Sequence, residues 1–200
     1  MRRLFCQIFW IFLILIAAGC KNPFATREAE PPTTDQSSWR LPTDPAIVLE
    51  NMRLAFYEKN VENYMKCLSD SQTLFRFIPD EYEASNSAGT FEQWNLAYEQ
   101  TYIKRLFTSI PADSSNILKF TPDQRLEFAD SVFIRTDYSL ELHHVLPAVY
   151  PRSAKGKADF WFMRHSGYWV ITRWEDYETI IDSASTRLPS WSTIKAVFLN

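Results

Sequence analysis

Two adjacent histidines, His143 and His144, are the side chains in this sequence best suited to acid–base chemistry. Histidine titrates near neutral pH, so it can move protons under ordinary conditions. Successive side chains of a strand point to opposite faces, which places His143 on a polar face and His144 on the apolar face that includes Leu142. His144 is therefore the histidine that can face the interior, either as a catalytic group or as a packed structural residue.

The acidic residues near this pair do not complete a site. By the same alternation, Asp137 and Glu141 lie on the polar face, away from His144. A metal site needs three or four convergent ligands, and two histidines with distant carboxylates do not supply them. We therefore predict no metal. We also predict no other cofactor, because the sequence has no phosphate-binding glycine-rich loop and no nucleophile-elbow motif.

The cysteines offer one nucleophile to the folded part of the chain. Cys6 and Cys20 lie in the N-terminal segment, which leaves Cys67 without a partner for an internal disulfide. A lone thiol can be a catalytic nucleophile. Cys67, however, stands between Lys66 and Leu68 in a helical pattern, and cysteines in such apolar surroundings are usually structural. We expect Cys67 to be packed.

The charge pattern argues against nucleic acid as a partner. The formal net charge is −3, from 21 basic and 24 acidic residues, and no run of five or six like charges occurs. Binding to phosphate backbones requires clustered Lys and Arg. Aromatic residues make up 16% of the chain, and because each ring buries much area, the chain can close a sizeable core.

The N-terminal segment has the features of an export signal. Two arginines precede an apolar run over residues 4–16, and small residues follow it. The sequence Ala17-Ala18-Gly19-Cys20 resembles the lipobox of bacterial lipoproteins. That resemblance implies diacylglycerol on the Cys20 sulfur, cleavage before Cys20 and acylation of the new amino group. An uncleaved anchor is the alternative, but this apolar segment is shorter than the roughly 20 residues that a membrane-spanning helix needs.

This assignment divides the chain into three parts: a signal peptide at 1–19, a lipidated cysteine with a tether at 20–43, and a folded domain at 44–200. The tether contains prolines among Ser, Thr, Glu and Gln, a composition with little to bury. The residue directly after the cysteine is Lys21, and in this respect the sequence resembles lipoproteins that are sent to the outer membrane. We expect an exported protein that is anchored by lipid to a bacterial membrane. Where the source has two membranes, we expect the periplasmic face of the outer membrane rather than the inner membrane.

Hydrophobic periodicity in the domain predicts helices first and strands afterwards. Helical spacing begins after Asp44, a capping residue, with Pro45 in the first turn. Thr90 and Gln93 form a capping-box pattern that predicts the start of a longer helix. After Pro111 the period changes to two, which predicts strands. The predicted elements are helices at 45–58, 61–68 and 90–107, a loop at 80–89, strands at 74–78, 118–128 (one interrupted strand or two short ones), 132–145, 155–165 and 168–174, a hairpin turn at 164–167 and a helical turn at the C-terminus.

Aromatic residues mark two of these elements. Trp94, Tyr98 and Tyr102 recur at helical spacing, and Trp174 lies on the last predicted strand. Rings placed in this way can line a ligand pocket between helix and sheet. The same spacing is typical of a packed core, which is the interpretation we favour.

The order helix, short helix, strand, helix and then long antiparallel strands is an α+β order. It resembles the cone-shaped fold of nuclear transport factor 2, ketosteroid isomerase and scytalone dehydratase over residues 44–176. The resemblance rests on Leu54-Ala55-Phe56-Tyr57, Val61-Glu62-Asn63-Tyr64, Ala158-Asp159-Phe160-Trp161-Phe162 and Gly167-Tyr168-Trp169-Val170-Ile171, followed by Trp174 and Asp176. It implies a curved antiparallel sheet wrapped on three N-terminal helices, a cystatin-like cone with a conical pocket.

The enzymes of this family suggest which residues would react. The isomerase branch uses a base carboxylate with a tyrosine and a protonated acid, and the resemblance offers Tyr57 and Tyr64 as the tyrosines. The dehydratase branch needs a His–Asp pair inside the cone, for which His144 is the candidate. Other relatives fill the cone with side chains and catalyse nothing, so the fold does not decide the function.

Two hypotheses follow. The first is a noncatalytic module on the cell envelope that binds a small ligand or assembles with an envelope protein or a second copy of itself. The second is a small enzyme of the isomerase or dehydratase type. A carboxylate within hydrogen-bond reach of His144 in a cavity favours the enzyme. A cone filled by Trp and Phe, or a sheet with exposed apolar residues, favours the module.

Overall fold

The computed structural model of the protein describes residues 38–70, 75–180 and 187–199. The predicted signal peptide, Cys20 and residues 21–37 of the predicted tether lie outside the described residues. One compact unit begins at Ser38. Within the described ranges, no helix is both long enough and apolar enough to cross a membrane.

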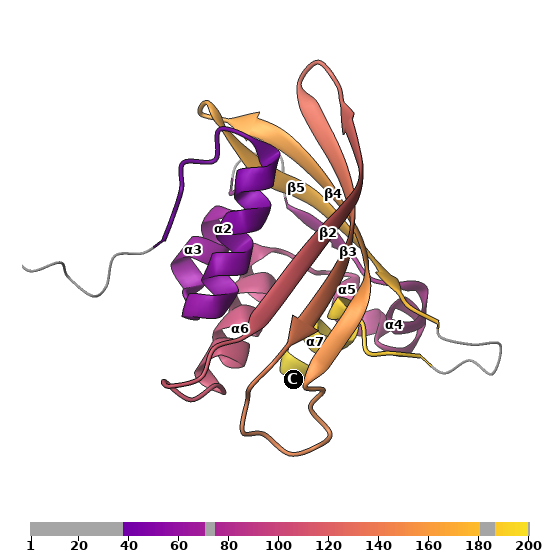
Figure 1. The fold of residues 1–200 in the computed structure, drawn as a ribbon. Helices are drawn as coiled ribbons and strands as arrows, with labels where there is room; N and C mark the ends of the chain where they lie inside the picture. The colour runs from indigo at the N-terminus through magenta and orange to yellow at the C-terminus, as the bar shows by residue number, and fades with distance from the viewer. Residues whose placement is uncertain (1–37, 71–74, 181–186, 200) are drawn as a thin grey trace, which may run out of the picture. The chain divides into compact units, whose positions relative to one another are not determined.

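A curved five-stranded sheet forms the centre of this unit (Figure 1). Its spatial order is β1-β5-β4-β3-β2, and neighbouring strands are antiparallel except for β1 and β5, which are parallel. Together with the helices, this sheet gives the α+β cone predicted from the sequence. The strands are β1 (Arg76–Ile78), β2 (Ile117–Glu127), β3 (Ser131–Glu141), β4 (Ser153–His165) and β5 (Tyr168–Glu178).

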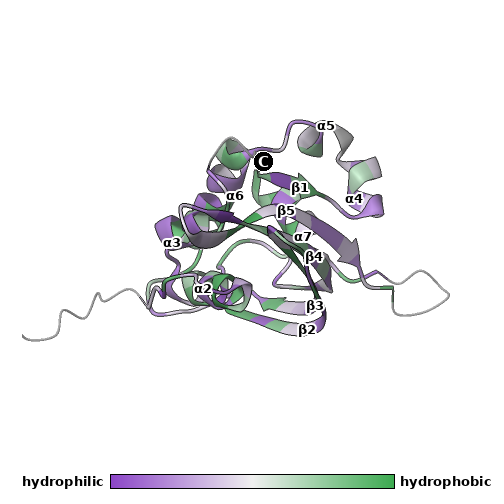
Figure 2. Cartoon of the chain, turned by 90° about the horizontal axis from the view of Figure 1, so that it is seen from above, coloured by the Kyte–Doolittle hydropathy of each residue, from purple (hydrophilic) through white to green (hydrophobic). Residues whose placement is uncertain are grey.

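Helices α2, α3 and α6 cover the concave face of the sheet, with α2 beside the β2 edge and α6 toward β1 and β5 (Figure 2). Helix α2 begins where the sequence predicts, because the Asp44 carboxylate accepts a hydrogen bond from the Ala46 N–H at 2.8 Å and Pro45 needs no partner for its nitrogen. It ends at Lys59 in a left-handed conformation. The helices are α2 (Pro45–Glu58), α3 (Val61–Lys66), α4 (Glu81–Asn86), α5 (Ala88–Phe91), α6 (Leu96–Thr108) and α7 (Trp191–Leu199).

The region between β1 and α6 differs from the prediction. Residues 81–86, predicted as part of a loop, form α4, which is capped by the Asp80 carboxylate. Thr90 does not start the long helix, because it lies inside the short helix α5. The cap of α6 is Asn95, whose side-chain oxygen accepts the N–H groups of Ala97 at 2.9 Å and Tyr98 at 3.3 Å. One amide that satisfies two orphan N–H groups outcompetes the pattern at Thr90.

The strands follow the predicted pattern with two adjustments. The region 117–127 is one strand, with an irregularity at Pro122, which lacks an N–H and lies on an edge of the sheet. Strand β3 ends at Glu141, so the two histidines follow the strand instead of lying on it. The hairpin between β4 and β5 is confirmed, and its turn residues Ser166 and Gly167 both have positive φ, as a tight hairpin turn requires.

Trp191 of the C-terminal helix α7 lies at the centre of the core. Its ring contacts Phe56 on α2, Tyr138 on β3 and Trp174 on β5, with centroid distances of 5.4, 5.2 and 4.5 Å. It also stacks on Phe120 of β2. Such edge-to-face and stacked contacts add to the area that the rings bury. The interior of the cone is therefore filled by a residue of the chain's own C-terminus.

Residues 38–43, predicted as the end of the tether, pair with the domain. The Arg40 N–H donates to the Asn51 side-chain oxygen at 3.0 Å, and the Asn51 amide donates to the Arg40 carbonyl at 2.7 Å. The Trp169 N–H then donates to the Pro42 carbonyl at 2.8 Å. This strap, residues 38–43, fixes the start of the unit to α2 and to the β4–β5 hairpin.

Gly156 is a position where the fold leaves no space for a methyl group. An added Cβ would lie 2.4 Å from the Tyr177 carbonyl oxygen and 2.5 Å from the Tyr138 hydroxyl. We expect Gly156→Ala to lower the free energy of unfolding by about 1–3 kcal/mol through overpacking, measured by urea denaturation. Gly89→Ala is the matched control, because no atom lies within 4 Å of its added Cβ, and a helical alanine should be neutral or slightly stabilising. Equal losses in the two variants would contradict this packing argument.

Candidate functional site

A buried ion pair between Glu99 and Lys195 lies inside the cone. Both side chains are fully buried, and the Lys195 ammonium donates to both carboxylate oxygens. The Tyr64 hydroxyl donates to Oε1 of Glu99 at 2.5 Å, and the Trp94 indole N–H donates to Oε2 at 2.6 Å. Each carboxylate oxygen thus has one neutral donor and a share of the ammonium, which offsets part of the cost of removing the charges from water.

Four aromatic rings surround the same ammonium. Its nitrogen lies 4.0 Å from the ring centroid of Phe77 and 4.2 Å from that of Trp174. The rings of Tyr102 and Trp94 follow at 5.1 and 5.2 Å. The faces of aromatic rings attract cations, more strongly where water is excluded. We call Glu99 together with these four rings the ammonium cage.

The positions of the cage residues follow from the elements that carry them. Glu99 and Tyr102 are three residues apart on α6 and therefore share a helix face. Phe77 and Trp174 are partners in the register of β1 and β5. Lys195 lies four residues after Trp191 on α7, so both point into the cone. Burial lowers the pKa of Lys195 to about 8, although Glu99 acts in the opposite direction, so the amine stays mostly protonated at neutral pH.

A second polar cluster holds the N-terminus of α7. The Asp176 carboxylate accepts the Tyr138 hydroxyl at 2.8 Å, and it accepts the backbone N–H and the hydroxyl of Ser192, each at 2.6 Å. The Trp191 N–H donates to the Tyr138 oxygen at 2.7 Å. These are N–H groups that a helix cannot satisfy internally. Burial raises the pKa of Asp176 to about 6, against the lowering effect of its hydrogen bonds.

Further contacts fix both ends of α7. The Ser190 hydroxyl donates to the Asp80 carboxylate at 2.5 Å and accepts the Thr193 N–H at 3.1 Å, which makes Ser190 the cap of the helix. At the other end, the Arg105 guanidinium of α6 donates to the Leu199 carbonyl. Side chains from the rest of the domain therefore hold α7 at both ends, and the cage holds its middle.

The structure brings three of the predicted ligand-binding residues together. Trp94, Tyr102 and Trp174 all face the Lys195 ammonium. Tyr98, also predicted, is 36% exposed and lies outside the cage, where its ring stacks on Trp94 at 6.1 Å. What these rings surround is a cation of the same chain.

The predicted catalytic residues are not brought together. Tyr64 is buried, and its hydroxyl is hydrogen-bonded to Glu99. Tyr57 is 55% exposed on α2. His144 is buried as its pattern predicts, 2% exposed, with its ring packed against Tyr150 and Phe198. No carboxylate is among the hydrogen-bond partners of His144 in the described residues.

The hydrogen bonding of His144 shows its tautomer. Its Nε2 lies 3.0 Å from the Pro151 carbonyl oxygen, and because a carbonyl only accepts, Nε2 carries the proton. Nδ1 has no hydrogen-bond partner among the described residues. His143 is exposed, and its Nδ1 lies 2.6 Å from the Ser115 carbonyl oxygen. Both histidines therefore contact backbone and not an acid.

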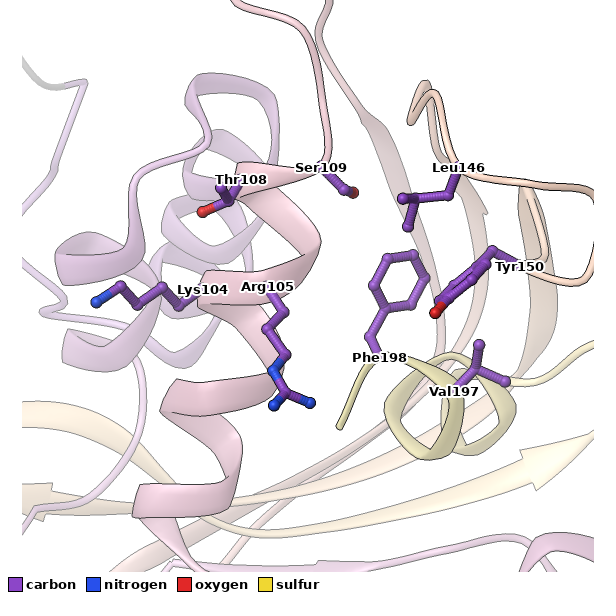
Figure 3. A pocket seen from close by; sticks show the side chains of 8 residues that line it. All are labelled: Lys104, Arg105, Thr108, Ser109, Leu146, Tyr150, Val197 and Phe198. Atoms are coloured by element: carbon purple, nitrogen blue, oxygen red, sulfur yellow. The ribbon is translucent and has the colours of Figure 1, made fainter. Parts of the chain in front are cut away.

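Several cavities lie outside the cone among the described residues, including one between helices and one open groove. One, of about 400 Å³, lies between α6, α7 and the 142–152 loop. Figure 3 shows the Phe198 ring between α6 and the Tyr150 ring, with Lys104 extending away from it. The open groove, of about 720 Å³, lies where residues 39–42 meet α3 and the β4–β5 turn, and Trp39 and Tyr168 are among its lining residues. No cage residue lines either cavity.

The described residues provide neither a metal site nor a reactive cysteine. Within residues 38–70, 75–180 and 187–199, no three His, Cys, Asp or Glu side chains lie close enough to hold a metal ion. Burial raises the pKa of the Cys67 thiol, which suppresses its reactive thiolate form. The thiol is 3.3 Å from the Asn63 carbonyl oxygen in the core. Cys67 is packed, as its sequence context predicts.

Glu99 and Lys195 were not predicted as site residues. Their positions nevertheless carried a signal, because Glu99 shares the helix face of Tyr102 and Leu106, and Lys195 stands between Ile194 and Ala196 in a helix with no other charged residue. A charge on an apolar helix face is either exposed by a local irregularity or paired inside. This signal marks each charge as one that is paired or exposed, but it does not show which opposite charge is the partner.

Neither a protein-family model nor a curated protein sequence matches the chain. Among solved structures, a protein of unknown function from Mycobacterium tuberculosis is 11% identical, with a TM-score of 0.52 over 77% of this chain and 83% of that one. A nuclear transport factor 2-like protein of unknown function from Shewanella oneidensis is 14% identical, with a TM-score of 0.42 over 68% and 99% of the two chains. A cystatin-like domain of unknown function from Nostoc punctiforme is 10% identical, with a TM-score of 0.44 over 65% and 72%. At these identities the likeness concerns the fold alone.

Asp176 gives the domain a pH dependence of known sign. Its pKa of about 6 in the folded protein exceeds its ordinary value of 3.8, so the native state binds this proton more tightly than the unfolded chain. Asp176 therefore makes its largest contribution to the free energy of unfolding below pH 4. This contribution decreases by about 3 kcal/mol as the pH rises from 4 to 6. We expect the stability of the wild type relative to Asp176→Asn to fall across this window, measured by urea denaturation at pH 4, 5, 6 and 7. The exposed Asp113→Asn is the control, and a pH-independent difference for Asp176→Asn would refute the assignment.

The ion pair predicts a specific pattern in a double-mutant comparison. Glu99→Gln leaves the buried Lys195 ammonium without a counter-charge and should cost about 3–5 kcal/mol of unfolding free energy. Adding Lys195→Met removes the second charge at similar volume, so the double variant should recover most of that loss. Urea denaturation followed by tryptophan fluorescence measures all three proteins. If the double variant is no more stable than Glu99→Gln, the buried charge is not the cause of the loss.

Proposed function

We propose that this chain is a lipid-anchored lipoprotein of the bacterial cell envelope whose cone domain works by binding and not by catalysis. One observation carries the proposal: Trp191 and Lys195 of the chain's own C-terminal helix occupy the interior of the cone. An enzyme that used this cone would need that space for its substrate.

The distribution of acid–base groups supports a noncatalytic role. His144 contacts a backbone carbonyl and two rings, Tyr57 faces solvent, and Tyr64 donates to Glu99 inside a filled core. Burial raises the pKa of Tyr64 well above its ordinary value, which makes it a poor acid. No observation favours the alternative of an isomerase or dehydratase.

The outer face of the sheet carries aromatic and arginine side chains, of which Trp161 is half-buried and Phe133 is buried, 7% exposed. The rings of Phe133 and Trp161 lie 4.8 Å apart on it, with the Arg173 guanidinium 4.9 Å above the Trp161 ring. Arg135 makes two hydrogen bonds to Asp159, at 2.6 and 2.5 Å. Aromatic residues and arginine are enriched in protein interfaces. This composition supports an envelope protein or a second copy of the chain as partner.

The sequence of the N-terminal segment supports the anchor. The small residues before Cys20 and the proline-containing residues 21–37 suit a lipid anchor followed by a tether. Fully extended, the 17 residues between Cys20 and Ser38 would span roughly 60 Å. The domain would then act at some distance from the membrane, which we propose to be the periplasmic face of the outer membrane where the source has two membranes.

Cys20→Ser tests the anchor directly. The wild type should incorporate radiolabelled or alkyne-tagged palmitate and sediment with membranes as a processed chain, whereas Cys20→Ser should take up no label and should accumulate as the unprocessed precursor. Stable anchoring of the processed chain needs two or more acyl chains, which Cys20→Ser cannot carry. Cys67→Ser is the control and should keep the label. A label that persists in Cys20→Ser would exclude lipidation at this position.

A further inference from the structure

The ammonium cage is complete without the helix that supplies its cation. The residues of the cage and its donor Tyr64 all precede α7 in the chain, namely Tyr64, Phe77, Trp94, Glu99, Tyr102 and Trp174. The neutral donors Tyr64 and Trp94 hold the Glu99 carboxylate from two sides. The carboxylate is therefore oriented by the cone itself, and the ammonium of Lys195 completes the site from outside.

Helix α7 contacts the rest of the domain in the way that a separate helix contacts a binding groove. Its first N–H groups are received by Asp176 and Tyr138, and its last described carbonyl is received by Arg105. Between these ends, Trp191 fills the apolar part of the cone and Lys195 fills the cage. Helix α7 thus has polar contacts at both ends, with an aromatic anchor and a cation between them. A helix bound in the groove of a partner protein makes contacts of the same kind.

Stability alone does not explain the charge inside the cage. Replacing a buried ion pair by apolar residues of similar volume is often neutral or stabilising, so a Met with an apolar partner would close the same core. Four rings with a carboxylate form instead the arrangement by which proteins recognise alkylammonium groups. The rings and the carboxylate of the cage are suited to binding an alkylammonium group, and the Lys195 side chain supplies such a group.

We infer that the cone contains a recognition site for an alkylammonium group, and that Lys195 on α7 is its intramolecular occupant. A ligand that carries an alkylammonium group competes with α7 for the cage and releases the helix. A small free amine and a lysine on a partner's helix share this chemistry. The inference rests on the proposed binding role of the domain, but it does not depend on the lipid anchor at Cys20.

The first test restores the missing cation to a variant. In the full chain, Lys195→Ala removes the three carbons and the nitrogen of n-propylammonium, so that ion should bind in their place. We expect n-propylammonium at ten times its Kd to raise the Tm of Lys195→Ala by about 3–6 °C, saturably. Equal concentrations of n-propanol and of NaCl should not. The same amine should leave Lys195→Met unchanged, because Met fills the volume, and should leave the exposed-site control Lys119→Ala unchanged.

Two outcomes of this test overturn the inference. One is an equal rise with n-propanol, since a cavity that accepts any apolar group is not an ammonium site. The other is no rise with the amine. If Lys195→Ala does not fold alone, refolding on addition of n-propylammonium supports the inference, and failure to refold counts against it.

The second test uses the unaltered chain. We expect n-butylammonium chloride to accelerate amide hydrogen exchange in residues 191–199 about fivefold or more relative to NaCl at the same ionic strength, because the amine captures the state in which α7 has left the cage. A peptide of residues 188–199 forms a second arm, with its Lys195→Met form as control. Acceleration by the peptide at lower concentration than by the amine identifies a helix-borne lysine as the preferred source.

Equal exchange in amine, peptide and NaCl would show that the ion pair is a fixed part of the core, and the inference would fail. Palmitate labelling at Cys20 is unaffected by that result. Failure of the ammonium site and failure of the anchored binding module are therefore separate outcomes.

Discussion

The burial of one ion pair, Glu99 with Lys195, is the constraint on which the rest of the domain depends. Charges in an apolar interior persist only when their hydrogen-bonding capacity is used. Tyr64 and Trp94 use that capacity on the carboxylate, and the rings of the cage face the ammonium. Each of these side chains reaches the pair only if its own element is in place. The pair therefore couples α3, α6, β1, β5 and α7 into one arrangement.

The same pair makes the C-terminus part of the cone's interior. Glu99 and Lys195 are 96 positions apart in the chain, and strands β2 to β5 lie between them in sequence. Contacts of this kind carry the entropy cost of closing a long loop. Trp191 adds the apolar area that offsets this cost. The interior of this cone is filled by the chain's own helix, which is the reason that we propose binding and not catalysis.

Much of the fold could be predicted from patterns that depend on local chemistry. The cap at Asp44, the strand alternation and the turn at Ser166-Gly167 are set by neighbouring residues, and each was predicted correctly. The start of α6 was misplaced, because Thr90 and Asn95 both resemble caps in sequence and only the structure shows that Asn95 accepts two N–H groups of the helix. A helical turn was predicted at the C-terminus, but its position at the centre of the core was not predicted.

The candidate site was harder to predict because it joins residues that are distant in sequence and breaks the rule that charges lie outside. Periodicity identified Trp94, Tyr102 and Trp174, since apolar residues repeat where they are buried. It could not assign Glu99 and Lys195 to each other, because neither position alone shows which charge will meet it. The strap at residues 38–43 has a mechanical consequence for this interior. A pull on the N-terminal segment would load the Ser38–Glu58 hydrogen bond first and then the Arg40–Asn51 and Pro42–Trp169 hydrogen bonds, none of which involves a cage residue.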